Sequence, residues 1–334
     1  MNYAVVIGIN DYLKRPLKGA VADATEFSNW LIQNNHVTAA NLKLLVSASS
    51  NQVAATHDID KAFVSILNDA EAHREEKNRL YFYFSGHGIG VSYTNTGLCL
   101  RFWDNDLPNY NISTREYQDT LVNKAIFDEI LIFLDCCRDY DFLIEPHKPS
   151  LDRTRIGERQ TSVLTCYSTA YGKLSYEIQK EINGEDSNNK RGAFTSFLLE
   201  GLKGDADVDG DGFITGDDLV NHISANFKTY ALKYNKEQAA EATVSNNGNK
   251  INICSVAKTT AKHNYTITFK RQSNISIFDG GNNPVANATG INVVIGQELK
   301  LVLPKGLIKM VDNTTKEEKY FTNYNPDTES HEQF

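Results

Sequence analysis

Up to about residue 255, apolar runs of strand length alternate along the chain with segments of helical periodicity. This alternation is typical of βαβ units, in which helices connect the parallel strands of one sheet. Some runs, such as "ILIFL" (130–134), are apolar at successive positions, as strands covered by helices on both faces are. We therefore predict an α/β fold with a mostly parallel sheet flanked by helices. The expected strands are 3–9, 42–46, 79–84, 129–135 and 162–168, and the expected helices are 20–35, 59–74, 193–202 and about 217–233.

The pattern changes after residue 261. The stretches "YTITF", "ISIFD", "INVVIG" and "LKLVL" are short and alternating, and Gly, Asn and Pro separate them. This is typical of a small all-β module. We expect a first domain over 1–256, a β-sandwich-like module over 262–322, and a polar tail over 323–334 that is disordered.

Charge argues against a nucleic-acid partner. The chain of 334 residues has 34 Lys and Arg against 42 Asp and Glu, a formal net charge of −8. Its basic residues are scattered, whereas a surface that follows phosphates needs them gathered on one face. The longest apolar runs are too short to span a bilayer, so no membrane partner is expected.

The cysteines and the start of the chain indicate a reducing compartment. The five cysteines form an odd count without framework spacing, and the sequence contains no CxxC. This pattern favours free thiols. The N-terminus lacks the basic region of a signal peptide and enters a strand-like run directly. We expect a cytoplasmic protein.

Two expected strands end in residues that carry chemistry. "SGHG" (85–88) follows the third strand, and "DCCR" (135–138) follows the fourth. Consecutive strands are usually neighbours, and ligands of an open α/β sheet bind beyond the carboxyl ends of the strands. His87 would therefore lie near the cysteine pair, where an imidazole can take the proton of a thiol. The backbone N–H groups of Gly88 and of the nucleophilic cysteine would then form an oxyanion hole.

Each of these residues also has a structural interpretation. A buried cysteine is usually an inert small hydrophobe, and a histidine after a strand often only hydrogen-bonds within its loop. The combination is harder to explain this way. Both groups stand at strand ends, and 50 positions separate His87 from Cys137, an interval found in caspases.

The chain resembles caspase-type peptidases, especially the metacaspase-like branch. "SGHG" and "DCCR" carry the resemblance, together with "VVIGINDY" (5–12), "LKGAVADA" (17–24) and "GAFTSFLLEGL" (192–202). The five motifs occur in the family's order and cover roughly residues 1–255. The resemblance implies the caspase-like fold and a cysteine endopeptidase that needs no cofactor for its chemistry.

The resemblance also selects one of the two cysteines. The nucleophile of metacaspases is the second residue after the strand-end Asp, and that of caspases directly precedes an Arg. Both patterns select Cys137. Cys136 directly continues a buried strand, so its side chain is expected to pack in the core.

In metacaspases, three further motif positions line a pocket for a basic side chain. Here they are Asp23, Ser85 and Asp135. Ala20 departs from the family, which often has Cys there. Carboxylates accept charge-assisted hydrogen bonds from Arg and Lys, bidentate from Arg, so cleavage after Arg and, more weakly, Lys is expected. The alternative for each Asp is a charge at a helix N-terminus or a turn residue.

"DADVDGDGFITGDDL" (205–219) resembles a calcium loop. A register starting at Asp207 is favoured over one starting at Asp205, which would put Gly216 at the twelfth position. The ligands would be Asp207, Asp209, Asp211, the carbonyl of Phe213, Thr215 and Asp218. The alternative is an Asp/Gly turn whose side chains satisfy backbone donors. Calcium is thus the one ion that the sequence indicates.

Three other segments contain several charged residues. "WDND" (103–106) reads as a solvated turn, or else as part of the acidic calcium site that metacaspases place near their active centre. "EINGEDSNNKRGAF" (181–194) is polar and turn-rich, and it offers Lys190 and Arg191 as a site of self-cleavage. "LDRTRIGERQ" (151–160) is a second candidate, with Arg153, Arg155 and Arg159.

Together these observations predict a caspase-like cysteine endopeptidase that acts on protein or peptide substrates through a Cys137/His87 dyad. The C-terminal β module would serve recognition or bind a regulatory partner. The rival interpretation is a catalytically silent, calcium-responsive interaction protein on the same fold, since a fold does not fix a function.

Overall fold

The computed structural model describes residues 1–47, 55–104, 106–140, 144–179, 190–207, 210–245, 250–256, 265–285, 288–304, 306–323 and 330–333. The chain divides into two units. The first comprises Met1–Leu202 with Thr215–Cys254, and the second comprises Lys203–Ile214 with Ser255–Phe334.

A six-stranded sheet forms the centre of the first unit. Its strands are β1 (Asn2–Ile9), β2 (Leu42–Ser47), β3 (Arg79–Ser85), β7 (Glu129–Asp135), β8 (Ser162–Tyr167) and β12 (Glu241–Ser245), in the order β12-β8-β7-β3-β1-β2. Five strands are parallel, and β12 closes one edge antiparallel to β8. The expected α/β fold with a mostly parallel sheet is therefore confirmed.

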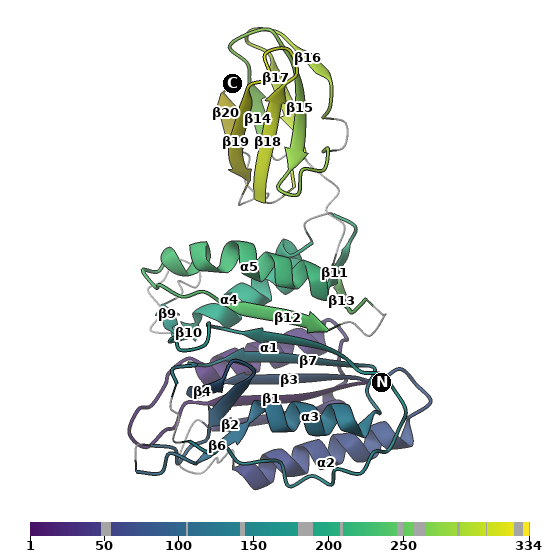
Figure 1. Ribbon diagram of the computed structural model, residues 1–334, viewed down its shortest axis with the longest axis vertical. Helices are drawn as coiled ribbons and strands as arrows, with labels where there is room; N and C mark the ends of the chain where they lie inside the picture. Colours follow the sequence, from purple (N-terminus) through teal and green to yellow (C-terminus); the bar gives the residue numbers. More distant parts are fainter. Residues whose placement is uncertain are drawn as a thin grey trace. The chain divides into compact units, whose positions relative to one another are not determined.

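Helices cover both faces of this sheet. They are α1 (Ala20–Gln33), α2 (Thr56–Ala72), α3 (Thr114–Lys124), α4 (Ala193–Glu200) and α5 (Gly216–Leu232). In Figure 1, α1, α4 and α5 lie on one side of the sheet and α2 and α3 on the other.

Successive residues of β3 show how the two layers are built. The ring of Tyr83 stacks on Phe27 of α1 with 4.5 Å between centroids. Its neighbour Phe82 points the opposite way, 5.3 Å from Phe63 of α2 and 6.4 Å from Tyr117 of α3. Because side chains alternate along a strand, an uninterrupted apolar run packs against the helices on both faces of the sheet.

The first unit also has two sets of short antiparallel strands, one after β3 and one after β8. β4 (Gly88–Ser92), β5 (Asn95–Cys99) and β6 (Asn111–Ser113) form an antiparallel sheet. β9 (Glu177–Gln179) and β10 (Lys190–Gly192) form an antiparallel pair that precedes α4. The remaining elements are η1 (Ala39–Asn41), η2 (Gly201–Asp205), β11 (Phe213–Thr215) and β13 (Asn252–Ser255), of which β11 and β13 pair.

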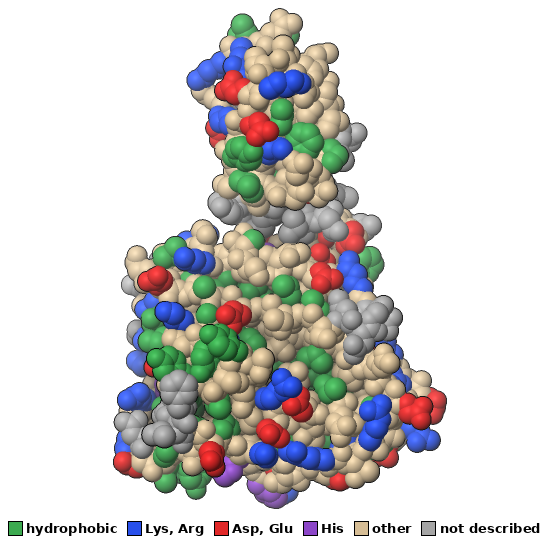
Figure 2. Space-filling model, viewed as in Figure 1, with side chains coloured by type: hydrophobic (Ala, Val, Ile, Leu, Met, Phe, Trp, Pro, Cys, Tyr) green, Lys and Arg blue, Asp and Glu red, His purple; other side chains and the backbone are tan. Residues whose placement is uncertain are grey.

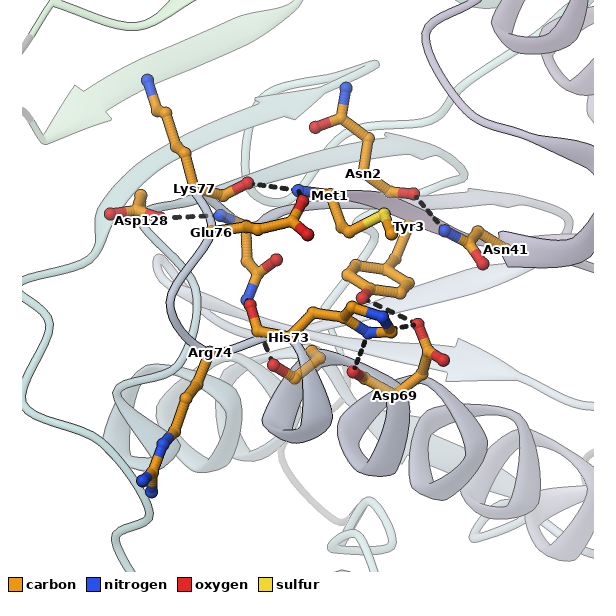
Figure 3. A network of polar contacts seen from close by, with 12 residues as sticks. Met1, Asn2, Tyr3, Asn41, Asp69, His73, Arg74, Glu76, Lys77 and Asp128 are labelled. Carbon is orange, nitrogen blue, oxygen red and sulfur yellow. Dashed lines mark hydrogen bonds and ion pairs between the residues drawn. The ribbon is translucent and has the colours of Figure 1, made fainter.

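The opposite, amino ends of the strands are held by a polar network (Figure 3). Tyr3 of β1 donates its hydroxyl to Asp69 of α2 at 2.8 Å, and Nδ1 of His73 lies 2.8 Å from the carbonyl oxygen of Asp69. Asn78 is fully buried near this end and donates to the carbonyl of Ala70 at 3.2 Å. These contacts join β1, α2 and the start of β3. His73 and Asn78 are therefore suitable controls for substitutions at the opposite ends of the strands.

From residue 265 onward the second unit is all-β, as expected. Its strands are β14 (Tyr265–Thr268), β15 (Ser273–Asp279), β16 (Ile291–Val293), β17 (Glu298–Leu301), β18 (Gly306–Asp312), β19 (Glu318–Asn323) and β20 (Ser330–Gln333). They form one sheet of order β17-β14-β20 and another of order β16-β15-β18-β19, around one apolar core.

The tail is not disordered throughout, contrary to expectation. Within 323–334, the strand β20 pairs parallel with β14. Glu332 forms an ion pair with Lys319 at 2.8 Å. Backbone pairing does not require apolar side chains, so a polar composition did not exclude a strand.

Charged side chains of both signs are interspersed on the face of the first unit seen in Figure 2. No helix in the described part of the chain is long and apolar enough to cross a membrane.

Candidate active site

The third and fourth strands of the sequence analysis are neighbours. β3 and β7 pair in parallel, with Ser85 opposite Asp135, so His87 and Cys137 each follow two residues beyond paired positions. The two loops pack tightly here. A Cβ atom added to Gly88 would lie 2.6 Å from both the sulfur of Cys136 and the carbonyl oxygen of Cys137. A larger residue at position 88 would push them apart.

His87 is held in one tautomer by its surroundings. Its Nε2 lies 2.7 Å from the backbone carbonyl oxygen of Arg15. A carbonyl only accepts hydrogen bonds, so Nε2 carries the proton and Nδ1 keeps its lone pair. The ring lies against Tyr12 and Trp103, at centroid distances of 4.5 and 5.6 Å. Burial lowers the pKa of His87, although the Arg15 carbonyl opposes that shift. The imidazole is therefore neutral, with its lone pair on Nδ1.

The two cysteines differ in environment. Cys136 is 2% exposed, and the hydroxyl of Ser168 bonds both its N–H (3.1 Å) and its carbonyl (2.9 Å). Cys137 is only half-buried, and its sulfur accepts the backbone N–H of Ser175 at 3.3 Å. Burial raises the pKa of the Cys137 thiol, and this N–H opposes the rise. Cys137 is thus the more exposed residue, and its side chain rests as a neutral thiol.

The N–H groups of Gly88 and Cys137, which are expected to form the oxyanion hole, do not take part in the hydrogen bonds between β4 and β5. Gly88 faces Leu98 across β4 and β5, and the N–H of Cys99 donates to the carbonyl of His87 at 3.0 Å. Gly88 and Leu98 are therefore a pair without mutual hydrogen bonds, which leaves the Gly88 N–H pointing away from β5. The N–H of Cys137 donates to no backbone carbonyl of the described residues.

Asp135 is buried and accepts hydrogen bonds at the start of α4. Its Oδ2 takes the N–H (2.9 Å) and hydroxyl (2.7 Å) of Thr195, and its Oδ1 takes the Ser175 hydroxyl at 3.0 Å. Burial raises the pKa of Asp135, and the Thr195 donors oppose this. The alternative role of a carboxylate at a helix N-terminus therefore applies to Asp135 as well.

Asp23 is also buried, and it forms an ion pair with Arg191 of the same chain. Nε of Arg191 lies 2.6 Å from Oδ1, and the N–H of Gly192 lies 2.8 Å from Oδ2. The hydroxyl of Ser85 is more distant, at 3.4 Å. Burial, and next the charge of Asp135, raise the pKa of Asp23 to about 7, against the influence of Arg191.

A third carboxylate lies beside these two, and the sequence analysis missed it. Oε1 of Glu177 accepts the backbone N–H groups of Lys18 (2.9 Å) and Gly19 (2.5 Å) at the start of α1. Burial lowers the pKa of His87 and raises that of Asp135, and the negative charge of Glu177 opposes the first shift and adds to the second. Glu177 is half-buried, unlike Asp23 and Asp135. A single Glu in "LSYE" gives no sequence signal beyond its place after the fifth expected strand.

The expected calcium loop is described only in part, because Asp209 lies outside the described residues. Oδ2 of Asp207 accepts the Gly212 N–H at 3.0 Å, and Oδ1 of Asp211 accepts the Phe213 N–H at 2.8 Å. These are the backbone contacts of an Asp/Gly turn.

The last two expected ligands form a helix cap. Oδ2 of Asp218 accepts the Thr215 N–H at 2.9 Å and its hydroxyl at 2.6 Å, and the Thr215 hydroxyl accepts the Asp218 N–H at 3.3 Å. This is a capping box at the start of α5. In the described ranges, no group of three or more His, Cys, Asp and Glu side chains is placed to hold a metal ion. Calcium binding stays a prediction.

The two aspartates of "WDND" contact backbone N–H groups and a lysine. Oδ1 of Asp104 accepts the N–H groups of Asp106 (2.8 Å) and Leu107 (2.9 Å), and Lys14 forms ion pairs with both aspartates. This fits the turn that the sequence analysis favoured. Asn105 lies outside the described residues.

The two residues of the expected self-cleavage site are placed differently. The side chain of Lys190 is exposed, whereas Arg191 is buried against Asp23 and also pairs with Glu26. Residues 181–189 of that segment lie outside the described residues. In the second candidate segment, Arg153 forms an ion pair with Glu116 at 2.8 Å.

Most of the chain is similar to a known protein family. The family model for the caspase domain matches residues 1–256. A probable protease from a Desulfuromonadales bacterium is 32% identical over 244 residues, which cover 61% of this chain and 26% of that protein. The chain thus spans about a quarter of the length of this curated relative. The crystal structure of a Geobacter sulfurreducens protein has a TM-score of 0.44 and 12% identity over 74% of this chain and 94% of that chain, a likeness too distant to carry an argument.

Proposed function

The chain belongs to the caspase-domain family, and from this premise we propose that it is a cysteine endopeptidase with Cys137 as nucleophile and His87 as base. The observation that carries the proposal is the parallel pairing of β3 with β7, from whose ends the two residues extend. The difference in exposure between Cys137 and Cys136 supports the choice of cysteine.

The proposed reaction begins from a neutral pair. Nδ1 of His87 takes the thiol proton as the sulfur of Cys137 attacks the scissile carbonyl. The N–H groups of Gly88 and Cys137 stabilise the oxyanion. The imidazolium then protonates the leaving amine, and water activated by the same ring hydrolyses the thioester. The Nε2–H bond to the Arg15 carbonyl keeps the ring oriented and stabilises its protonated form.

We propose that the residue before the scissile bond is basic, Arg in preference to Lys. Asp23, Ser85 and Asp135 remain the proposed pocket residues, and Glu177 joins them. Because Asp23 already pairs with Arg191, the half-buried Glu177 offers a carboxylate oxygen more readily. An Asp substrate would place a like charge among these groups, at a cost of several kcal/mol.

The substrate would bind as an added strand. β9 pairs with β10 along one edge, and no described strand pairs with its other edge. An extended peptide can hydrogen-bond to such an edge while its side chains enter pockets. We further propose self-cleavage, calcium modulation at 207–218, a cytoplasmic location, and recognition of a regulatory partner by the C-terminal β module.

Hydrolysis of tetrapeptide amides tests the proposal. The wild type should cleave after Arg, less after Lys, and not after Asp. His87→Ala should lower kcat at least a hundredfold. His73→Ala is the matched control, because its ring nitrogen also meets a backbone carbonyl, at the other end of the sheet (Figure 3). Equal effects of the two substitutions, or no hydrolysis by folded wild type, would favour the silent interaction protein.

A further inference from the structure

Gln238 lies in the segment between α5 and β12, and its side chain is 3% exposed. Its amide makes three hydrogen bonds. Nε2 donates to the carbonyl of Ser168 at 2.8 Å and to the hydroxyl of Ser175 at 3.0 Å, and Oε1 accepts the N–H of Tyr176 at 3.1 Å. A primary amide has both donors and acceptors, so it can hold polar groups of both kinds.

Two of the three partners of Gln238 contact the proposed nucleophile or the residue before it. The N–H of Ser175 donates to the sulfur of Cys137 at 3.3 Å, and the hydroxyl of Ser175 donates to Asp135 at 3.0 Å. The hydroxyl of Ser168 bonds the backbone of Cys136 on both sides. One buried side chain therefore connects the thiol, the strand-end carboxylate and the backbone of the residue before the nucleophile.

The segment around Gln238 supports the same stretch of chain from outside. Ala239 accepts the N–H of Ala170 at 2.9 Å, and Nζ of Lys236 lies 5.1 Å from the centre of the Tyr176 ring. Residues 236–239 thus lie along residues 168–176. That stretch passes Cys137 and continues into β9, the proposed edge for substrate binding.

We propose that Gln238 is a positioning residue, which fixes Ser175 so that its N–H stays on the sulfur of Cys137. The inference rests on the proposed function, since it takes Cys137 as the nucleophile. A backbone N–H stabilises the thiolate more than the thiol, so its alignment matters most as negative charge forms on sulfur.

The pKa of the Cys137 thiol is a suitable readout, because a general loss of stability would not raise it specifically. Burial and the charges of Asp135 and Asp139 raise the pKa of Cys137, and the Ser175 N–H opposes them. Loosening Ser175 removes the opposing contribution, so the pKa should rise further. A rise of about one unit is the scale of one hydrogen bond to an ionised group.

Gln238→Met removes the amide and keeps an unbranched side chain of similar size. Gln238→Leu also removes the amide and, unlike a Glu substitution, adds no buried charge near Cys137, so it should have the same effect. Asn78→Leu is the matched control. It removes another fully buried amide, whose donors reach the carbonyls of Ala70 and Ile126 near the amino ends of the strands.

The rate of iodoacetamide labelling at Cys137 is measured against pH, with the site quantified by mass spectrometry. Labelling needs no peptidase activity, so the result stands even if no substrate is cleaved. Gln238→Met should raise the midpoint by about one unit and lower kcat on Arg substrates about tenfold, with a smaller change in KM. Asn78→Leu should leave the midpoint in place.

Two results would overturn the inference. One is a midpoint in Gln238→Met equal to that of wild type, in protein shown to be folded by thermal unfolding. The other is an equal rise in Asn78→Leu, which would mean that any buried amide has this effect. If Gln238→Met does not fold, the same two comparisons are made with Gln238→Leu.

Discussion

The guanidinium of Arg191 lies against the carboxylate of Asp23, with 2.6 Å between Nε and Oδ1. The next residue, Gly192, donates its N–H to the other oxygen of the same carboxylate at 2.8 Å. Asp23 is thus satisfied by the chain's own β10–α4 junction. If Asp23 helps to bind a basic substrate, it does so through its negative charge, together with the neighbouring Asp135 and Glu177.

This pair bears on self-cleavage. Arg191 is buried and its backbone pairs with Ile178, whereas the side chain of Lys190 is exposed. Although Arg is the preferred residue type, accessibility favours Lys190, because a protease acts on chain that it can reach. We expect a new N-terminus at Arg191, found by N-terminal sequencing. Cleavage after Arg191 would mean that the β9–β10 pair opens, and cuts persisting in Cys137→Ala would come from another protease.

The surroundings of Gly192 leave no room for a side chain. A Cβ atom there would lie 2.1 Å from Oδ2 of Asp135 and 2.8 Å from Oδ2 of Asp23. Gly192→Ala should therefore separate the two carboxylates, cost about 1–3 kcal/mol in the free energy of unfolding, and abolish cleavage after Arg. Gly280→Ala is the control, since its nearest neighbour would be 3.4 Å away. Urea unfolding and hydrolysis rates, measured side by side, check this. A fully active Gly192→Ala would exclude the carboxylate pair from substrate binding.

Charge recognition should depend on pH through Asp23. Burial raises its pKa to about 7, so the carboxyl group is mostly neutral below that pH and charged above it. The ratio of kcat/KM for an Arg substrate to that for its neutral citrulline analogue should rise with pH through about 7, by roughly tenfold if one charged hydrogen bond is gained. The ratio cancels effects on the dyad. A ratio that is flat from pH 5.5 to 8.5 would show that Asp23 does not sense the substrate.

Calcium binding can be tested apart from activity. Titration calorimetry should give heat with wild type and none with Asp211→Ala, because the fifth loop position would lose its ligand. Asp217→Ala is a control in the same segment that occupies no ligand position. Heat unchanged in Asp211→Ala would place the ion elsewhere, and no heat in wild type would remove calcium from the account.

The framework of the site was predictable because it depends on local patterns. Apolar runs that end in "SGHG" and "DCCR" place His87 and Cys137 at strand ends, and consecutive strands tend to pair. The resulting neighbours are those of the structure, with Ser85 opposite Asp135.

The residues that were missed depend on contacts between distant segments. Glu177 reaches the start of α1, which is 158 positions away in the sequence, and Gln238 reaches Ser175 across 63 positions. No local period encodes such contacts. β20 was missed for the same reason, since its partner β14 lies far before it in the chain.

α3 was missed although it had a local signal. Ser113 caps the helix by accepting the N–H of Glu116 at 3.2 Å, so the Ser and Glu spacing of a capping box was present in the sequence. Its apolar side is narrow, with Tyr117 and Leu121 as the large buried apolar side chains, which explains why periodicity did not reveal it.

The most direct measurement is covalent labelling by a peptide ketone that carries Arg next to the reactive carbon, with the modified residue located by mass spectrometry. The account predicts label on Cys137 and none on Cys136. It also predicts full labelling of Cys136→Ala and none of Cys137→Ala, in proteins with matching thermal unfolding. Label on Cys136, or a folded wild type that takes up no label, would contradict the central claim.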